Sequence, residues 1–102
     1  MKLKFDASKV PGLGGTEGLS RSEKMVPVKL FTPTSSWTWF ILEMNPETRE
    51  CFGLVCGFEK EFGYFWLDEL EAVVGPMGLG VEVDSWWTPK SLEAVMKAES
   101  ML

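Results

Sequence analysis

The chain of 102 residues contains no histidine, and this absence limits the chemistry that it can perform. Without an imidazole there is no Ser-His-Asp or Cys-His catalysis, no acid–base group that ordinarily titrates near neutral pH, and no metal site that depends on an imidazole ligand. We therefore expect no catalytic residues, no enzymatic activity and no cofactor.

Cysteine is also scarce, because Cys51 and Cys56 are the only two in the chain. If both lie on one strand, five steps of about 3.3 Å separate their Cα atoms by about 16 Å, whereas a disulfide needs Cα atoms within about 7 Å. Their odd separation also directs the side chains to opposite faces of the strand. We predict two free thiols, as is typical of a reducing compartment.

Long apolar runs are missing as well. The longest, residues 39–42, is far shorter than the roughly 20 residues that cross a bilayer. The N-terminal residues 1–6 lack the apolar run of a signal peptide. We therefore expect a cytoplasmic protein that makes no membrane contact.

Basic side chains are few and unevenly distributed. The chain has 10 basic and 15 acidic side chains, a formal charge of −5. Residues 1–28 carry five basic and three acidic side chains, whereas residues 29–102 carry five basic and twelve acidic ones. Binding to nucleic-acid phosphates needs a dense basic patch, which residues 29–102 lack. The charge suits a basic protein partner and not nucleic acid, or it serves only to keep the protein in solution.

Composition divides the chain into an arm and one domain. Residues 1–26 form a glycine-containing N-terminal arm, since Val10–Gly15 holds three glycines and a proline, which disfavour regular structure. Periodicity leaves open whether this arm docks on the rest of the protein or moves freely. Residues 27–102 have the length and composition of a single domain.

Alternating apolar residues predict antiparallel strands in this domain. Residues 37–44 are apolar on both faces, so they are expected to form a central strand. On the strand over 50–57, Gly53 and Gly57 leave room for a neighbouring ring or a bulge. The remaining predicted strands are residues 28–31, 62–66 and 81–84, with polar connections at 32–36, 45–49 and 59–61.

Two segments change to helical spacing. The first has Asp68 and Glu71 as a capping box and ends at Gly75; its apolar stripe is Leu67, Leu70, Val73 and Val74. The second has Thr88 as its N-cap ahead of Pro89; its stripe is Leu92, Val95 and Met96. The predicted fold is therefore α+β: an antiparallel meander sheet of three to five strands with one short helix and a C-terminal helix.

Several blocks of residues occur in an order that is recognisable. They are Phe31–Pro33, Trp37–Phe40, Phe52–Val55, Glu61–Phe65, Gly75–Leu79 and Glu82–Asp84. Together they resemble the family catalogued as domain of unknown function 2958, over residues 27–95, and Pro11 with Thr16-Glu17 extends the resemblance into the arm. Trp66 stands where that family has a helix-capping serine, and Val83 where it has an arginine.

The resemblance implies a setting and no activity. Members of the family are small single-domain proteins found mostly in bacteria, phages, plasmids and integrative elements, often among accessory and anti-restriction genes. No catalytic residue follows from the family. Its setting implies a counter-defence role for a mobile-element protein.

Aromatic residues supply the candidate interaction surface. Aromatic side chains on strands usually fill a core, but an exposed indole would mark an interface anchor. In an extended segment Trp86 and Trp87 would point to opposite sides, one into the core and one outward. The candidate interaction residues are Trp86, Trp87, Trp37, Trp39, Glu82 and Asp84.

Carboxylates provide the competing hypothesis. Acidic side chains on or beside the predicted strands could bind Mg²⁺ or Mn²⁺ for phosphoryl chemistry if they converged. The candidates for such ligands are Glu43, Glu61, Glu82 and Asp84. Twelve acids in residues 29–102 also produce neighbours by chance, so we assign no metal site to them.

These observations favour a small, acidic, non-enzymatic interaction protein that blocks a nucleic-acid-binding host protein. One alternative is a carboxylate-metal-dependent hydrolase acting on nucleic acid or nucleotide. Another is a single-stranded nucleic-acid-binding module that uses the basic arm with Trp37 or Trp39. An unpaired edge strand would also allow a homodimer.

Overall fold

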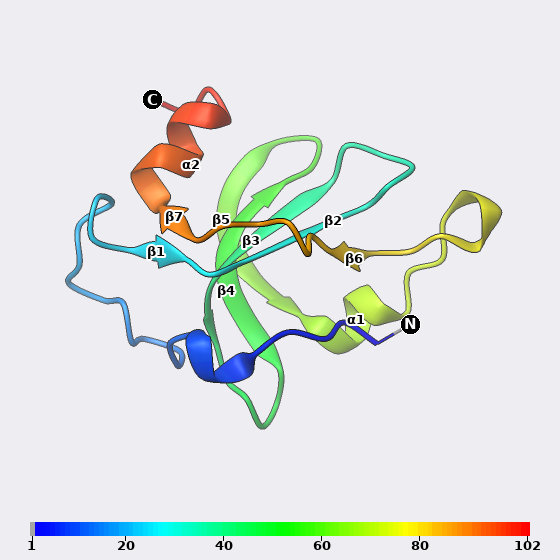
Figure 1. The fold of residues 1–102 in the computed structure, drawn as a ribbon, viewed down its shortest axis with the longest axis horizontal. Helices are drawn as coiled ribbons and strands as arrows, with labels where there is room; N and C mark the ends of the chain where they lie inside the picture. Colours follow the sequence, from blue (N-terminus) through cyan, green and yellow to red (C-terminus); the bar gives the residue numbers. More distant parts are fainter. Residues whose placement is uncertain (1) are drawn as a thin grey trace.

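The computed structural model describes residues 2–102, which fold around a five-stranded antiparallel sheet with strand order β5-β4-β3-β2-β6 (Figure 1). A second sheet pairs β1 with β7, and two α-helices complete the α+β fold that the sequence predicts. The strands are β1 (Met25–Val26), β2 (Val28–Phe31), β3 (Thr38–Met44), β4 (Glu50–Cys56), β5 (Lys60–Trp66), β6 (Glu82–Val83) and β7 (Lys90–Ser91). The helices are α1 (Leu67–Glu71), α2 (Leu92–Ala98) and the 3-10 turns η1 (Ala7–Lys9) and η2 (Pro76–Gly78).

The predicted meander is confirmed, with one correction at β5. Strand β3 lies at the centre of the sheet and is buried along most of its length, as its two apolar faces predict. Residues 59–61 were expected to be a polar connection, but Lys60 and Glu61 belong to β5. The ladder continues to the pair Cys56–Lys60, so the turn contains only three residues, which is enough to reverse the chain.

The sheet separates two apolar clusters. We call the side that packs against the N-terminal arm and α1 the arm face; its centre includes Leu30, Trp39, Ile41, Cys51 and Leu67. The side that packs against α2 is the helix face; its centre includes Phe40, Leu42, Leu54, Cys56 and Val95. Cys51 and Cys56 are therefore free, buried and on opposite faces, which confirms the prediction from their spacing.

Glycines at two positions of the β3–β4 region allow close packing. A Cβ at Gly53 would overlap the carbonyl oxygen of Phe40, because β3 bulges between Ile41 and Glu43 beside it. A Cβ at Gly57 would overlap the ring of Trp37, which lies directly on that glycine. The sequence-based expectation of a bulge or a neighbouring ring at these two glycines is confirmed.

Helix α1 is shorter than its sequence pattern predicts. It spans Leu67–Glu71, and Val73 and Val74 are 43% and 78% exposed instead of continuing the buried stripe. The N-cap is Trp66, whose side chain makes no capping hydrogen bond, so the capping box of Asp68 and Glu71 is wrong. Both acids instead bind Arg49. Adjacent β-branched residues ahead of Gly75-Pro76 disfavour a further turn.

Helix α2 also begins later than predicted. Its N-cap is Ser91, whose Oγ accepts the N–H of Ala94 at 3.1 Å, and not Thr88. The segment before it pairs with β1 as β7, and this pairing keeps Pro89 outside the helix. The arm completes the cap, since carbonyl oxygens of Lys24 and Arg21 accept the N–H groups of the first two helical residues. Glu93 and Lys97, which lie four residues apart on this helix, form an ion pair at 3.6 Å.

The N-terminal arm docks on the sheet. Leu3 and Val10 are buried in the arm-face cluster. The main-chain N–H of Met44, the last residue of β3, donates to the carbonyl oxygen of Pro11 at 2.8 Å. Figure 1 shows the arm in blue running along one side of the molecule toward β1. Among the described residues, no helix is both long and apolar enough to pass through a membrane.

Candidate protein-binding surfaces

Glu43 holds the arm in place and is not free to bind a ligand. Its carboxylate accepts the N–H groups of Gly14 at 2.8 Å and of Thr16 at 3.1 Å, and also the Thr16 hydroxyl. Burial raises its pKa, but these hydrogen bonds, with the Thr16 hydroxyl first, and the charge of Lys24 outweigh burial and hold the pKa below the ordinary value. The side chain is 5% exposed, and its oxygens serve the fold.

The four acids considered as metal ligands do not converge. Glu61 lies on edge strand β5, whereas Glu82 lies on β6 at the opposite edge of the sheet. Asp84 accepts the N–H of Trp86 at 3.0 Å and lies 3.7 Å from the Lys29 ammonium. Within residues 2–102, no group of three or more acids and cysteines is arranged to hold a metal ion.

Both thiols stay protonated at neutral pH. Burial raises the pKa of Cys51 to about 12 and that of Cys56 to about 11. The thiolate is the nucleophilic form, so neither side chain is activated for covalent chemistry. Their contribution is to the packing of the two faces of β4.

The turn after β6 exposes Trp86 and packs Trp87. The Trp86 side chain is 92% exposed, and the main-chain N–H of this residue donates a hydrogen bond to the carboxylate of Asp84. Trp87 packs on Phe40 at 5.7 Å between ring centroids and donates its indole N–H to the carbonyl of Val26 at 3.0 Å. The turn closed by Asp84, and not strand alternation, gives the two rings different environments. Trp87 is therefore structural, whereas Trp86 is free for a partner.

Two lysine side chains lie over the ring of Trp87. The ammonium groups of Lys90 and Lys29 lie 4.5 Å and 5.5 Å from its ring centroid. Cation–π contacts of this kind contribute about 0.5–1 kcal/mol at exposed sites. They attach β7 and β2 to the same ring, so Trp87 anchors the loop that presents Trp86.

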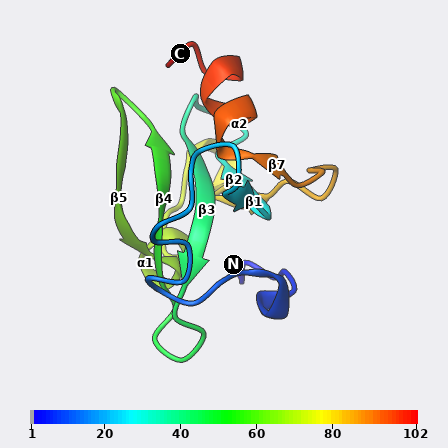
Figure 2. The ribbon, with the colours of Figure 1, turned by 90° about the vertical axis from the view of Figure 1, so that its left-hand side faces the viewer.

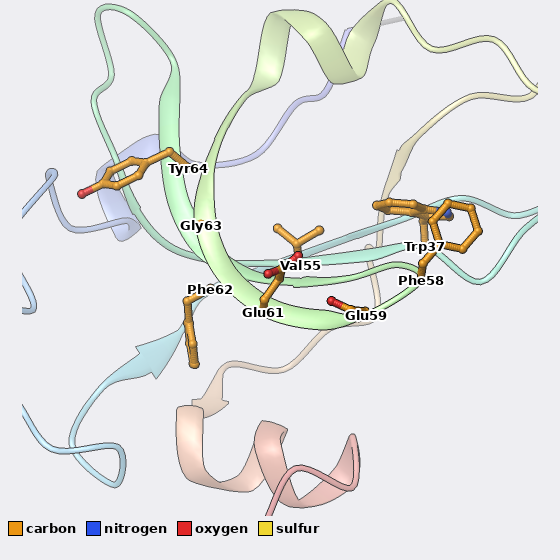
Figure 3. Close-up of a pocket in the computed structure, with 8 residues that line it drawn as sticks. All are labelled: Trp37, Val55, Phe58, Glu59, Glu61, Phe62, Gly63 and Tyr64. Atoms are coloured by element: carbon orange, nitrogen blue, oxygen red, sulfur yellow. The ribbon is translucent and has the colours of Figure 1, made fainter.

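A second surface lies at the end of the β4–β5 hairpin. Trp37 stacks on the buried Trp39 at 5.9 Å and meets the ring of Phe58 edge-on at 5.4 Å. Phe58 is 96% exposed. Figure 3 shows this ring pair at one end of the site, with Glu59 next along the ribbon and Glu61 farther away beside Val55. They border a shallow hollow of about 440 Å³, which we call the hairpin hollow; its lining is Trp37, Val55, Phe58, Glu59, Glu61, Phe62, Gly63 and Tyr64.

Phe58 was missed by the sequence analysis, although a signal was present. It stands in a polar three-residue turn, Gly57-Phe58-Glu59, where no strand alternation requires an aromatic ring. An apolar ring at the tip of a turn has no core to fill, which is the pattern of a contact residue. Trp39, which was considered for the surface, is only 7% exposed and belongs to the core.

A third aromatic group covers the outer part of the helix face. Phe52 on β4 stacks with Phe62 at 6.4 Å and contacts Tyr64 at 4.9 Å. Phe62, Tyr64 and Trp66 are 41%, 66% and 38% exposed, because α2 covers the sheet only as far as the side chains of β4. Aromatic rings therefore flank β5 on its helix face, while Glu61 and the hairpin hollow flank its arm face.

Arg49 joins the β3–β4 connection to α1. Its guanidinium donates two hydrogen bonds to Glu71, at 2.8 and 2.7 Å, and one to Asp68 at 2.6 Å. Glu71 also accepts the N–H of Leu3 at 2.7 Å, so the arm is attached to the same carboxylate. Hydrogen bonding to Arg49 lowers the pKa of Glu71 to about 2, although burial opposes the shift.

This shift predicts an acid-labile contribution of Glu71 to stability. A lowered pKa stabilises the folded state fully above the unfolded value of 4.5, and the contribution is lost as the pH falls from there toward 2. We expect Glu71→Gln to remove about 1 kcal/mol at pH 7 and to flatten the decline of the unfolding free energy below pH 4.5, since the pair is partly solvated. Urea unfolding between pH 7 and pH 3 measures both effects. Glu69→Gln, at an exposed acid in the same helix, is the control, and equal pH profiles for the two variants would contradict the assignment.

The fold and its surfaces define a class: a small α+β protein built on a five-stranded antiparallel sheet, with aromatic side chains exposed beside acids and, among residues 2–102, no group of acids and cysteines placed to hold a metal ion. The chain belongs to the family described as Protein of unknown function (DUF2958), whose sequence model matches residues 14–99. This confirms the resemblance and its extension into the arm, where Gly14 and Thr16 bind Glu43. No curated protein and no solved structure matches the chain.

Proposed function

We propose that this chain is a non-enzymatic interaction protein that occupies a basic, nucleic-acid-binding surface of another protein. The observation that carries the proposal is the exposure of two aromatic side chains beside carboxylates: Phe58 is 96% exposed next to Glu59, and Trp86 is 92% exposed next to Asp84. Large exposed rings in a small domain are typical anchors of protein interfaces.

Electrostatics supports the choice of partner. The formal charge is −5, and twelve of the fifteen acids lie in residues 29–102, which include nearly all of the five-stranded sheet and both α-helices. A field of this sign attracts a basic surface and repels nucleic acid, so the protein competes with nucleic acid for the same partner. The family resemblance adds the setting of mobile elements and anti-restriction genes, which supports a counter-defence role.

Capture from a host-cell lysate tests this function. We expect the immobilised chain to retain a basic protein that excess double-stranded DNA releases, because both ligands use one surface. Alanine substitution at an interface anchor costs 2 kcal/mol or more, so Phe58→Ala or Trp86→Ala should reduce capture roughly tenfold or more. Val74→Ala is the matched control, since Val74 is 78% exposed and apolar but carries no ring beside an acid.

Effects on binding can be separated from effects on folding, because neither ring belongs to the apolar core. Both side chains are almost wholly solvated, so thermal melting of the two variants should follow that of the wild type within about 0.5 kcal/mol. Capture that is insensitive to both substitutions, or a captured protein that DNA does not release, would contradict the proposed function.

A further inference from the structure

Strand β5 has one edge with which no strand pairs among residues 2–102. It pairs with β4 along its whole length and stands last in the strand order, and no described residue in 2–102 pairs with its other side. Figure 2 shows β5 as the border of the ribbon, with β4 and β3 on its inner side. An open edge of seven residues is a template for a further strand.

The ladder determines which main-chain groups face outward. The N–H of Gly57 donates to Glu59 and the N–H of Leu67 donates to Arg49, at 2.9 and 3.1 Å. Hydrogen-bonded pairs alternate along an antiparallel ladder, and the register of β4 and β5 is unbroken between these two bonds. The odd-numbered residues of β5 therefore face β4, and the N–H and C=O groups of Phe62 and Tyr64 face outward.

The side chains beside this edge differ between the two faces of the sheet. On the helix face, Phe62, Tyr64 and Trp66 present partly exposed rings. On the arm face, Gly63 leaves open space, since an added Cβ would meet no atom within 4 Å, and Glu61 is exposed beside the hairpin hollow. An apolar strip on one face and an acidic, aromatic-walled hollow on the other suit a strand of alternating character.

We propose that the partner binds by adding an extended segment of alternating basic and apolar residues to the outer edge of β5. Its main chain would pair with Phe62 and Tyr64, its apolar side chains would cover the rings on the helix face, and its arginine or lysine side chains would enter the hairpin hollow beside Glu61. Strand addition of this kind takes affinity from main-chain hydrogen bonds and specificity from alternate side chains.

Charge selects a basic segment over a second copy of the chain. Glu59 and Glu61 line the hollow and Glu50 on β4 pairs with the last residue of β5, whereas Lys60 is the one basic residue on strands β4 and β5. A second copy would bring a further charge of −5 to the same edge, which costs rather than gains electrostatic energy. This inference rests on the proposed function, because it names the chemistry and place of the partner's contact.

A designed peptide tests the mode of binding. The probe is Arg-Val-Arg-Val-Arg-Val-Arg with fluorescein coupled to its N-terminal amine and an amidated C-terminus, and its control is Arg-Arg-Val-Val-Val-Arg-Arg labelled in the same way, which has the same composition and charge without alternation. Fluorescence anisotropy with the full chain should give an affinity about tenfold higher for the alternating peptide, since only it presents separate basic and apolar faces. Equal affinities would reduce the interaction to charge attraction and overturn the proposal.

Variants of Tyr64 examine the main-chain contact. Tyr64→Pro removes an outward N–H that β4 does not use, a position where an edge strand tolerates proline, whereas Tyr64→Thr keeps the N–H and also removes the ring. We expect Tyr64→Pro to weaken binding of the alternating peptide about tenfold more than Tyr64→Thr does. Two peptides N-methylated on alternate amides provide the same test with the unaltered chain: one should lose binding, and binding by both would contradict strand addition.

Two further results separate this inference from the proposed function. Lysate capture that Phe58→Ala or Trp86→Ala abolishes but Tyr64→Pro leaves unchanged would retain the function and overturn the β5 edge as its site. A wild-type chain that light scattering shows to be dimeric, and that Tyr64→Pro makes monomeric, would assign the edge to a second copy and overturn the choice of a basic segment.

Discussion

Substitution of Gly53 with alanine is expected to lower the free energy of unfolding by about 3 kcal/mol, because an added Cβ meets a neighbouring atom more closely there than at any other glycine. The added Cβ would overlap the carbonyl oxygen of Phe40 and press on the Cα of Ile41. Both contacts are main-chain atoms of the central strand, so no side-chain rotation relieves them. Urea denaturation followed by tryptophan fluorescence measures the change.

Gly63 provides a closely matched control, because it lies directly opposite Gly53 in the β4–β5 ladder. A Cβ there meets no atom within 4 Å, and the residue is not in the left-handed region. Gly63→Ala should leave stability unchanged or raise it by about 0.5 kcal/mol, since alanine loses less conformational entropy on folding. Similar losses in the two variants would show that glycine flexibility, and not the bulge contact, sets the requirement.

Replacement of Glu43 with glutamine should cost about 2–3 kcal/mol at pH 7. The carboxylate accepts three hydrogen bonds from Gly14 and Thr16, and an amide replaces one acceptor oxygen by a donor that faces a donor. These hydrogen bonds attach the arm to β3. Without them the arm detaches more often, so limited proteolysis should cut first within residues 10–24. The same denaturation experiment gives the energy, and mass spectrometry locates the cut.

The pH dependence of the unfolding free energy distinguishes the hydrogen bonds of Glu43 from apolar packing. The pKa of Glu43 lies below its ordinary value in the folded protein, so its contribution is complete above the unfolded pKa and declines as the pH falls below it. The variant should lose less stability than the wild type on acidification. Glu47→Gln, at an exposed acid in the adjacent turn, is the control and should have no effect. An unchanged proteolysis pattern in Glu43→Gln would contradict the role of Glu43 in docking the arm.

Local patterns predicted the sheet, because each strand carries its own evidence. The apolar faces of residues 37–44 indicated the central position of β3. Gly53 and Gly57 indicated a bulge or a neighbouring ring, and the structure has a bulge beside Gly53 and a ring on Gly57. These features depend on residues that are near in sequence or opposite in one hairpin. Alternation and turn residues are sufficient to specify them.

Long-range pairing accounts for what the sequence did not predict. The start of α2 depends on Lys24 and Arg21, which are some 70 residues away along the chain and cap its first turn. The docking of the arm depends on Glu43, which from the sequence was a candidate metal ligand. Neither a capping carbonyl nor a buried carboxylate can be assigned from local spacing, because each acquires its partner only when distant segments fold together.

The exposed rings were partly predictable. Trp86 was a candidate from composition, whereas its exposure is set by the turn at Asp84. Phe58 was not a candidate from the sequence. Its contact with Trp37 follows from the length of the β4–β5 turn. Both lie in connections between strands, where side chains are free of the core and available to partners.

Competition for a purified partner gives the most direct test of the proposed blocking role. A captured basic protein is mixed with a fluorescent DNA duplex, and the anisotropy is followed as this chain is added. We predict that the duplex is displaced fully and that Phe58→Ala or Trp86→Ala requires roughly tenfold more protein for the same displacement. An anisotropy that stays constant or rises, as it would in a complex containing both ligands, would contradict the central claim that this chain and nucleic acid bind one surface.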